Sequence, residues 1–169
     1  GIVYRDQGRW AEALACFEAY VALRQADEAY DSVGRGLNNV GEILLFQGHL
    51  AEAIAAFQAA LEKMTTRVYR IDTHLYLGLA YQAMGKLNQA KEAFTNALAT
   101  AVAINRHEIL PHAHYRLGSI LAQLGEKTAA LSQYKLAAQS VETAMAPLRY
   151  EGLRMSLVGK WQQIYETLV

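Results

Sequence analysis

Pairs of a small and an aromatic residue, four positions apart, recur along the chain. The pairs are Ala13 and Phe17, Ala53 and Phe57, Ala90 and Phe94, and Ala130 and Tyr134. Residues four apart share one face of an α-helix, so each pair predicts a helix with a narrow apolar face towards a partner helix. The position three residues beyond each aromatic residue is usually occupied by a small residue. Its occupants are Tyr20, Ala60, Ala97 and Ala137.

Two sets of glycines precede these pairs at constant offsets. The first set is Gly41, Gly78 and Gly118, with Leu44, Tyr81 and Leu121 three positions later, and the second set is Gly48, Gly85 and Gly125; Gly1, Tyr4 and Gly8 form a further copy. A glycine inside a helix costs about 1 kcal/mol relative to alanine, so the first set predicts a partner helix too close for a Cβ. The second set predicts helix ends, where left-handed backbone suits glycine.

Together these patterns predict an all-α fold. Apolar residues make up 53% of the chain, and only two prolines interrupt it. Pro111 falls in the first turn of its predicted helix, where the missing N–H does least harm. The predicted helices cover residues 10–26, 31–47, 50–64, 67–84, 87–104, 108–124 and 127–143.

The segments His74-x-x-Leu77-Gly78-x-x-Tyr81 and Ala90-x-x-x-Phe94 resemble the tetratricopeptide repeat. The resemblance covers residues 1–141. The first glycines are 40, 37 and 40 residues apart, and the closing proline is absent, so the repeats are similar to the long-period type of kinesin light chains and bacterial signalling proteins. The resemblance implies an αα-hairpin solenoid, the tetratricopeptide superhelix, in which residues 1–146 form about three and a half hairpins.

The last part of the chain, residues 147–169, has a different pattern. Apolar residues there recur at steps of three to four without the repeat glycines, which predicts an amphipathic helix that caps the last hairpin or connects it to another domain. The segment from Arg154 to Leu168 resembles the helix that precedes the CHAT domain of bacterial proteases. The apolar positions are Leu148, Leu153, Leu157, Trp161, Ile164, Tyr165 and Leu168.

Charge and composition exclude several classes of function. Sixteen Lys and Arg balance sixteen Asp and Glu, so the chain lacks the basic surface expected of a nucleic-acid-binding protein. No stretch approaches the roughly 18 to 20 apolar residues of a membrane helix. Cys16 is the only cysteine, and we expect it to be a small core side chain in a reducing compartment. The chain is therefore expected to be cytoplasmic, and its start at Gly1 suggests a fragment of a longer protein.

The candidate chemical sites are weak, and we expect no enzyme, metal or cofactor. His107, His112 and His114 do not have the i, i+4 spacing with which two helical histidines chelate one ion. His74 and His114 occupy the Trp position of the repeat and are interpreted as core substitutes. The segment Gly34-Arg35-Gly36 has neither a preceding strand nor a following Lys-Ser/Thr pair, so it is not a nucleotide-binding loop.

In the tetratricopeptide architecture, the first helix of each hairpin lines a concave groove that binds peptides or helices. Asn39 takes the position at which many relatives hold a peptide backbone. Asp72 and Tyr76 stand where relatives that capture a C-terminal carboxylate have cations, which argues against that ligand. The candidate groove residues are Arg35, Asn38, Asn39, Glu42, Leu45, Phe46, Asp72, Leu75, Tyr76, Leu79, His112, Tyr115 and Arg116.

Three hypotheses of function follow. The first is a scaffold or adaptor module that binds a protein or peptide segment in the groove, along a strip that includes Leu45, Phe46, Leu75, Leu79 and Tyr115. The second is the sensor arm of a larger bacterial protein, for example a CHAT-type protease. The third is homo-oligomerisation through the open N-terminal repeat, residues 1–17.

Overall fold

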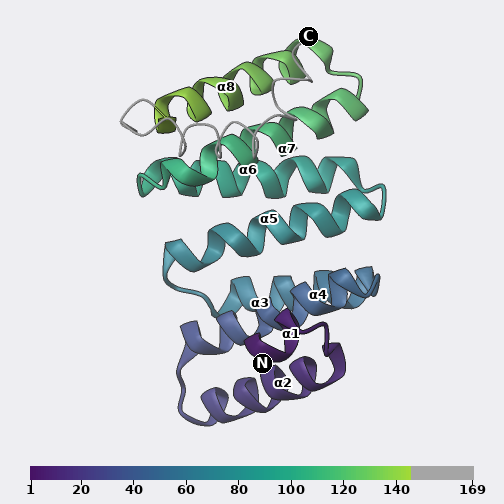
Figure 1. The fold of residues 1–169 in the computed structure, drawn as a ribbon, viewed down its shortest axis with the longest axis vertical. Helices are drawn as coiled ribbons and strands as arrows, with labels where there is room; N and C mark the ends of the chain where they lie inside the picture. Colours follow the sequence, from purple (N-terminus) through teal and green to yellow (C-terminus); the bar gives the residue numbers. More distant parts are fainter. Residues whose placement is uncertain (146–169) are drawn as a thin grey trace. The chain divides into compact units, whose positions relative to one another are not determined.

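The structure is a computed structural model that describes residues 1–145. This range consists of helices joined by short turns and contains no strand (Figure 1). Apart from α1, every α-helix begins and ends within about two residues of its predicted bounds. The elements are α1 (Ile2–Asp6), α2 (Trp10–Ala26), α3 (Tyr30–Phe46), α4 (Leu50–Lys63), α5 (Arg67–Ala83), α6 (Leu87–Ala103), the 3-10 helix η1 (His107–Ile109), α7 (Leu110–Gln123) and α8 (Lys127–Met145).

Contacts divide the chain into two compact units, Gly1–Ala93 and Phe94–Val169, and the division falls within α6. In the first unit α3 packs against α2, α4 and α5, so successive hairpins share a core. In the second unit α7 and α8 form one hairpin, and η1 contacts both of them. The predicted capping helix, residues 147–169, lies outside the described residues.

The first glycines make room for an aromatic ring. A Cβ on Gly41 would lie 2.6 Å from Cε1 of Phe57, and a Cβ on Gly118 would lie 2.8 Å from Cε1 of Tyr134. Both rings come from the second helix of the same hairpin. The expectation of a partner helix too close for a Cβ is therefore confirmed at both glycines, and the nearest atoms of that helix belong to an aromatic side chain.

The small and aromatic positions form the core, as predicted. Ala53, Phe57, Ala90 and Phe94 are completely buried. Tyr134 differs, since its ring is only partly buried. The small slot is also fully buried wherever it holds alanine, at Ala60, Ala97 and Ala137.

The second glycines end helices with left-handed backbone, as predicted, with φ of +81° at Gly48 and +80° at Gly125. Glu28 and Asn105 take the same conformation after α2 and α6, with φ of +53° and +57°. The sequence predicted the ends of both helices but not the left-handed backbone that follows them, because glycine is the usual marker of this conformation.

The turn after α4 has no such residue and is held by side chains. Met64 is extended, and the Asp31 carboxylate at the start of α3 accepts hydrogen bonds from the backbone N–H of Thr65 (2.7 Å) and of Thr66 (3.1 Å). The hydroxyls of both threonines also donate to Asp31. Arg70 donates to the carbonyl oxygen of Met64 at 2.9 Å, near the end of α4. Hydrogen bonds to one carboxylate therefore hold the α4–α5 turn against α3.

We predict that Gly41→Ala lowers the free energy of unfolding by about 1 to 3 kcal/mol, because the new Cβ overlaps the buried Phe57 ring. This loss outweighs the gain in helix propensity of about 1 kcal/mol. Urea denaturation followed by circular dichroism measures it. In a Phe57→Leu background Gly41→Ala should lower the free energy of unfolding clearly less. An equal loss in both backgrounds would show that the overlap with the Phe57 ring is not the cause.

We predict that the contribution of Asp31 to stability depends on pH. Its hydrogen bonds with Thr66 and Thr65 lower its pKa to about 2. The folded state thus favours the carboxylate, so the stabilisation is complete above about pH 4 and is lost as the pH falls towards 2. Asp31→Ala should cost about 1 kcal/mol at pH 7, as loss of a helix cap does.

The measurement is a series of urea denaturations of wild type and Asp31→Ala between neutral and acidic pH. The difference between the two proteins should shrink as the pH approaches 2. If the difference in the free energy of unfolding between the two proteins did not change with pH, the charge of the carboxylate would not stabilise this turn.

Candidate functional site

The candidate groove residues fall in both units, and each set is described by itself. In the first unit they lie on α3 and α5, and in the second unit they lie on α7. Arg35, Phe46, Asp72 and His112 are exposed, and Glu42 is buried. The others are partly exposed: Asn38, Asn39, Leu45, Leu75, Tyr76, Leu79, Tyr115 and Arg116.

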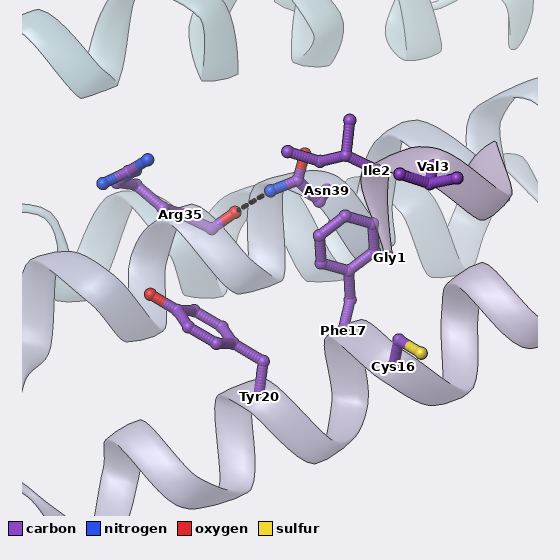
Figure 2. A pocket seen from close by; sticks show the side chains of 8 residues that line it. All are labelled: Gly1, Ile2, Val3, Cys16, Phe17, Tyr20, Arg35 and Asn39. Atoms are coloured by element: carbon purple, nitrogen blue, oxygen red, sulfur yellow. Dashed lines mark hydrogen bonds between the residues drawn. The ribbon is translucent and has the colours of Figure 1, made fainter. Parts of the chain in front are cut away.

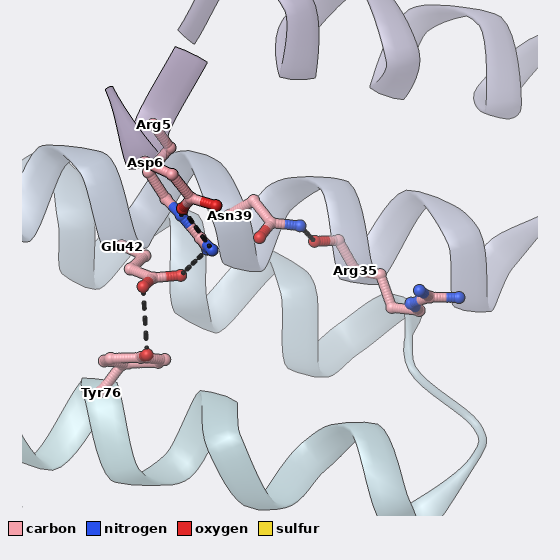
Figure 3. A network of polar contacts seen from close by, with 6 residues as sticks. All are labelled: Arg5, Asp6, Arg35, Asn39, Glu42 and Tyr76. Carbon is pink, nitrogen blue, oxygen red and sulfur yellow. Dashed lines mark hydrogen bonds and ion pairs between the residues drawn. The ribbon is translucent and has the colours of Figure 1, made fainter. Parts of the chain in front are cut away.

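The structure brings Glu42 and Tyr76 together in a polar network (Figure 3). Arg5 of α1 donates from Nη1 to Oε2 of Glu42 at 3.0 Å, and the Tyr76 hydroxyl donates to Oε1 at 3.1 Å. Only 9% of Glu42 is exposed. Burial, together with the Glu42 charge, raises the pKa of Tyr76 to about 12. The network thus links the first helices of three successive hairpins, and two predicted contact residues have an internal structural role.

Tyr76 also connects this face to the core. Its ring stacks on Phe57, with centroids 5.9 Å apart and planes 8° apart. The same Phe57 ring packs on Gly41. Phe57 therefore fills the space inside its own hairpin and also contacts the next hairpin.

Asn39 and Arg35 lie next to each other on α3. The Asn39 side chain donates from Nδ2 to the Arg35 carbonyl oxygen at 2.8 Å. The Arg35 guanidinium lies over the Tyr69 ring, 5.0 Å from its centroid. An aromatic ring thus positions the cation while leaving Arg35 exposed.

The predicted apolar strip is continuous only in part. Phe46 is 64% exposed but stacks on Trp10 of the preceding hairpin, with centroids 6.1 Å apart. In the second unit Tyr115 contacts the core ring of Tyr134, with centroids 5.7 Å apart. Some strip residues therefore contact neighbouring helices, whereas Leu75 and Leu79 of α5 remain partly exposed.

A cavity of about 470 Å³ adjoins Arg35 and Asn39 (Figure 2). Cys16 is exposed there, so the prediction that it is a core side chain is wrong. Cys16 precedes the buried Phe17 by one residue, which turns it towards a different side of α2. The cavity is lined by Gly1, Ile2, Val3, Cys16, Phe17, Tyr20, Arg35 and Asn39.

Sequence reasoning placed Ile2, Val3 and Cys16 only in the open N-terminal repeat considered for self-association, residues 1–17, and did not assign Tyr20 to any site. One signal was present, because Tyr20 occupies the slot that holds alanine in the other three copies. A side chain much larger than its equivalents breaks the packing rule of the repeat. Such an exception marks a position where the surroundings of the hairpin differ.

His74 and His114, the predicted core substitutes, are both partly buried. Nδ1 of His114 is 2.8 Å from Oε1 of Gln133 on α8. Burial, with a smaller effect of Arg70, lowers the pKa of His74 to about 4. The imidazole of His74 is therefore neutral at physiological pH.

Metal-binding clusters and membrane-spanning helices are both absent from residues 1–145. That range holds no group of three or more His, Cys, Asp and Glu side chains arranged to bind a metal ion. Within it, too, every helix is too short or too polar to cross a bilayer.

Two family models match the chain. Residues 1–66 match the model described as Tetratricopeptide repeat. Residues 42–148, more than half of the chain, match the model of the Suppressor of spindle checkpoint defect 1 C-terminal domain.

Two curated proteins are similar over part of the chain. The Transcription activator GutR of Bacillus subtilis (strain 168) is 29% identical over 105 residues, which are 61% of this chain and 12% of that protein. The Protein O-mannosyl-transferase TMTC2 of Homo sapiens is 30% identical over 99 residues, 59% of this chain and 11% of that protein. The chain thus spans about a tenth of the length of these relatives.

Solved structures share the fold. The nearly identical TPR-like repeats of a Podosopora anserina kinesin light chain superpose with a TM-score of 0.71 at 19% identity, over 96% of this chain and 81% of that one. MamA gives a TM-score of 0.64 at 21% identity, over 96% and 91%. The Yersinia enterocolitica Type III Secretion Translocator Chaperone SycD gives 0.59 at 19% identity, over 83% and 96%. The predicted fold class, an all-α array of αα-hairpins of the tetratricopeptide type, is confirmed.

We predict that Glu42→Ala lowers the free energy of unfolding by about 2 kcal/mol, because the substitution removes the acceptor of two hydrogen bonds and leaves Arg5 and Tyr76 without it. Glu42→Gln should cost less, since the amide oxygen still accepts one bond. Urea denaturation at neutral pH measures both variants.

The matched control is Glu52→Ala, because the Glu52 side chain is 70% exposed. A surface substitution of this kind changes stability by less than about 0.5 kcal/mol. If Glu42→Ala were as mild as this control, the network would not stabilise the first unit.

Proposed function

The chain belongs to the tetratricopeptide repeat family and, through residues 42–148, to the family of the Suppressor of spindle checkpoint defect 1 C-terminal domain, and on this premise we propose that it is a scaffold that binds a segment of another protein. The proposed binding face in the first unit is formed by α3 and α5. It includes the predicted groove residues Arg35, Asn38, Asn39, Leu75 and Leu79.

The observation that carries this proposal is the face of α3 and α5, where Asn39, Leu75 and Leu79 are partly exposed beside the Glu42 network. Binding sites are mostly apolar, with a few polar groups that orient the ligand. Here Leu75 and Leu79 supply the apolar surface, and the Asn39 amide and the exposed Arg35 guanidinium supply the polar groups. A partner side chain would lose contact with water against the two leucines while its backbone meets the amide.

The Glu42 network supports this role by holding the face in one arrangement. Arg5, Glu42 and Tyr76 join the first helices of three hairpins through two hydrogen bonds. A binding surface that is already ordered does not have to lose conformational freedom when the partner arrives. Glu42 and Tyr76 are thus proposed as positioning residues, and direct contact is left to Asn39, Leu75 and Leu79.

The second unit offers its own contact residues on α7. His112 is exposed, and Tyr115 and Arg116 are partly exposed. An aromatic ring next to an arginine is a common pair at the centre of protein interfaces. We include these three residues in the proposed contact surface of the second unit.

A regulatory arm of a larger multidomain protein is the second candidate. It is favoured by the relatives, since the matched segments make up 12% and 11% of their lengths. A CHAT-type protease is one such protein. The resemblance to the CHAT-linked helix falls on residues 154–168, outside the described residues, and stays a prediction, as does self-association through residues 1–17.

The proposal predicts that peptides selected from a random display library on the immobilised chain need α3 and α5 for binding. The double variant Asn39→Ala with Leu79→Ala should weaken a selected peptide by about tenfold, equivalent to about 1.4 kcal/mol. The dissociation constant is measured by fluorescence anisotropy with a labelled peptide.

The control variant is Glu62→Ala, an exposed position on α4, the second helix of its hairpin. Circular dichroism verifies that all variants are folded. If the peptides bound the double variant and the control with equal affinity, the α3–α5 face would not be the binding site.

A further inference from the structure

A groove lies between α2 and α3, away from the proposed α3–α5 face. It has a volume of about 260 Å³ and is called the α2–α3 groove below. Leu37 of this groove precedes Asn39 by two residues, so its side chain points to nearly the opposite side of α3. The groove is therefore separate from the face on which Asn39 lies. Its lining residues are Glu18, Val21, Ala22, Gln25, Leu37 and Val40, and the volume is that of the space among them, about 260 Å³.

The small side chain of Leu37 contributes to this open space. In the tetratricopeptide pattern W-x-x-L-G, Leu37 takes the Trp position before Val40 and Gly41. A leucine side chain is smaller than an indole and fills less of the space between two helices. The two helices are close at Gly36 of α3, where a Cβ would lie 2.5 Å from Cγ2 of Val21. The groove is thus an apolar space beside a close helix contact.

The next pair of helices, α4 and α5, has an arginine at the corresponding place. Leu61 and His74 occupy the repeat positions of two groove residues, Val21 and Leu37. Arg70 of α5 donates from Nη1 to the carbonyl oxygen of Leu61 at 2.7 Å. After burial, the charge of Arg70 also contributes to the lowered pKa of His74, so the guanidinium lies near His74 as well. An arginine side chain thus covers the place that is open between α2 and α3.

The α2–α3 groove has a carboxylate where the next pair of helices has a cation. The repeat position of Arg70 holds Val33 in α3, which is only 3% exposed. Among the six lining residues Glu18 alone has a charged side chain, and it is exposed. Gln25 is exposed too, and its amide oxygen is a further hydrogen-bond acceptor. The groove therefore combines an apolar floor with acceptors at its rim.

We propose that the α2–α3 groove binds an arginine side chain of a partner protein, in the way that Arg70 covers the corresponding place between α4 and α5. The aliphatic part of the arginine packs on Val21 and Leu37, and its guanidinium donates two hydrogen bonds to the Glu18 carboxylate. This site goes beyond the proposed scaffold face, because it is formed by other residues on another side of α3.

Charge and shape select arginine over other side chains. An acidic segment would bring a carboxylate against Glu18, and like charges at an interface disfavour a partner. An aliphatic side chain would fill the groove but leave the carboxylate without a partner. Lysine can pair with Glu18, but its ammonium group cannot form the two parallel hydrogen bonds of a guanidinium. An arginine between apolar residues satisfies both parts of the lining.

The test uses three peptides that differ at one residue. Each is acetyl-Ala-Leu-Xaa-Leu-Ala-amide, in which Xaa is Arg, Lys or Glu. The peptides are titrated into the whole, uniformly ¹⁵N-labelled chain, and the amide chemical shifts give both the dissociation constant and the place of binding. The arginine peptide should shift the amides of Val21, Leu37 and Val40. It should bind more tightly than the glutamate peptide by about tenfold and more tightly than the lysine peptide by about threefold.

Two variants change the groove in different ways. Glu18→Arg should weaken the arginine peptide by about tenfold and strengthen the glutamate peptide, so that the preference reverses. The matched control Glu52→Arg makes the same charge change at an exposed position of α4 and should leave the preference unchanged. Leu37→Trp restores the ring of the repeat pattern and should weaken the arginine peptide by filling the groove. Circular dichroism verifies that the variants are folded.

Three results would overturn the proposal: equal binding of the arginine and glutamate peptides, an unaltered preference in Glu18→Arg, or amide shifts confined to other parts of the chain. Failure here is separable from failure of the scaffold function. The double variant Asn39→Ala with Leu79→Ala should still bind the arginine peptide with unchanged affinity. If that variant lost the arginine peptide while Glu18→Arg kept it, the peptide would belong to the α3–α5 face, and the α2–α3 groove would not be its site.

Discussion

The contact between a glycine of the first helix and an aromatic ring of the second is the interaction on which the α3–α4 and α7–α8 hairpins depend. At Gly41 and Gly118 the ring lies where a Cβ would be, so the two helices approach with the ring between them. Glycine costs helix stability, but it lets a fully buried Phe57 contribute about 1.5 to 3 kcal/mol of apolar burial. The same ring then stacks on Tyr76 of the next hairpin, so one side chain holds both a hairpin and its neighbour.

This dependence explains why part of the predicted binding face has a structural role. Tyr76 contacts the core through Phe57 and holds Glu42 through its hydroxyl, and Arg5 completes the same network. The first helices therefore divide their polar residues into two groups. Buried and paired residues keep the hairpins in register, and exposed residues such as Arg35 belong to the proposed contact surface. We expect a substitution in the first group to change stability and one in the second group to change the proposed recognition.

The cavity lies where the packing rule changes. In the later copies this position holds a fully buried alanine, whereas in the first copy the Tyr20 ring packs over Gly36 and lines the cavity with Ile2 and Phe17. The exposed Cys16 belongs to the same exception. Repeat proteins share a common scaffold. A change of residue at one position that is small in the other repeats gives the surface at that repeat a different shape.

The sequence by itself determined the helices, their bounds to within about two residues, the left-handed ends at the second glycines and the buried set that includes Ala53, Phe57, Ala90 and Phe94. These are local or periodic properties, and recurrence at fixed offsets makes them readable. Only the tertiary structure decided that aromatic rings are the nearest neighbours of Gly41 and Gly118, that Glu42 pairs with Arg5 and Tyr76, and that Cys16 lines a cavity. Such facts depend on the direction in which each side chain meets residues of other helices, and helical spacing alone carries no information about a contact between positions 37 or 34 residues apart.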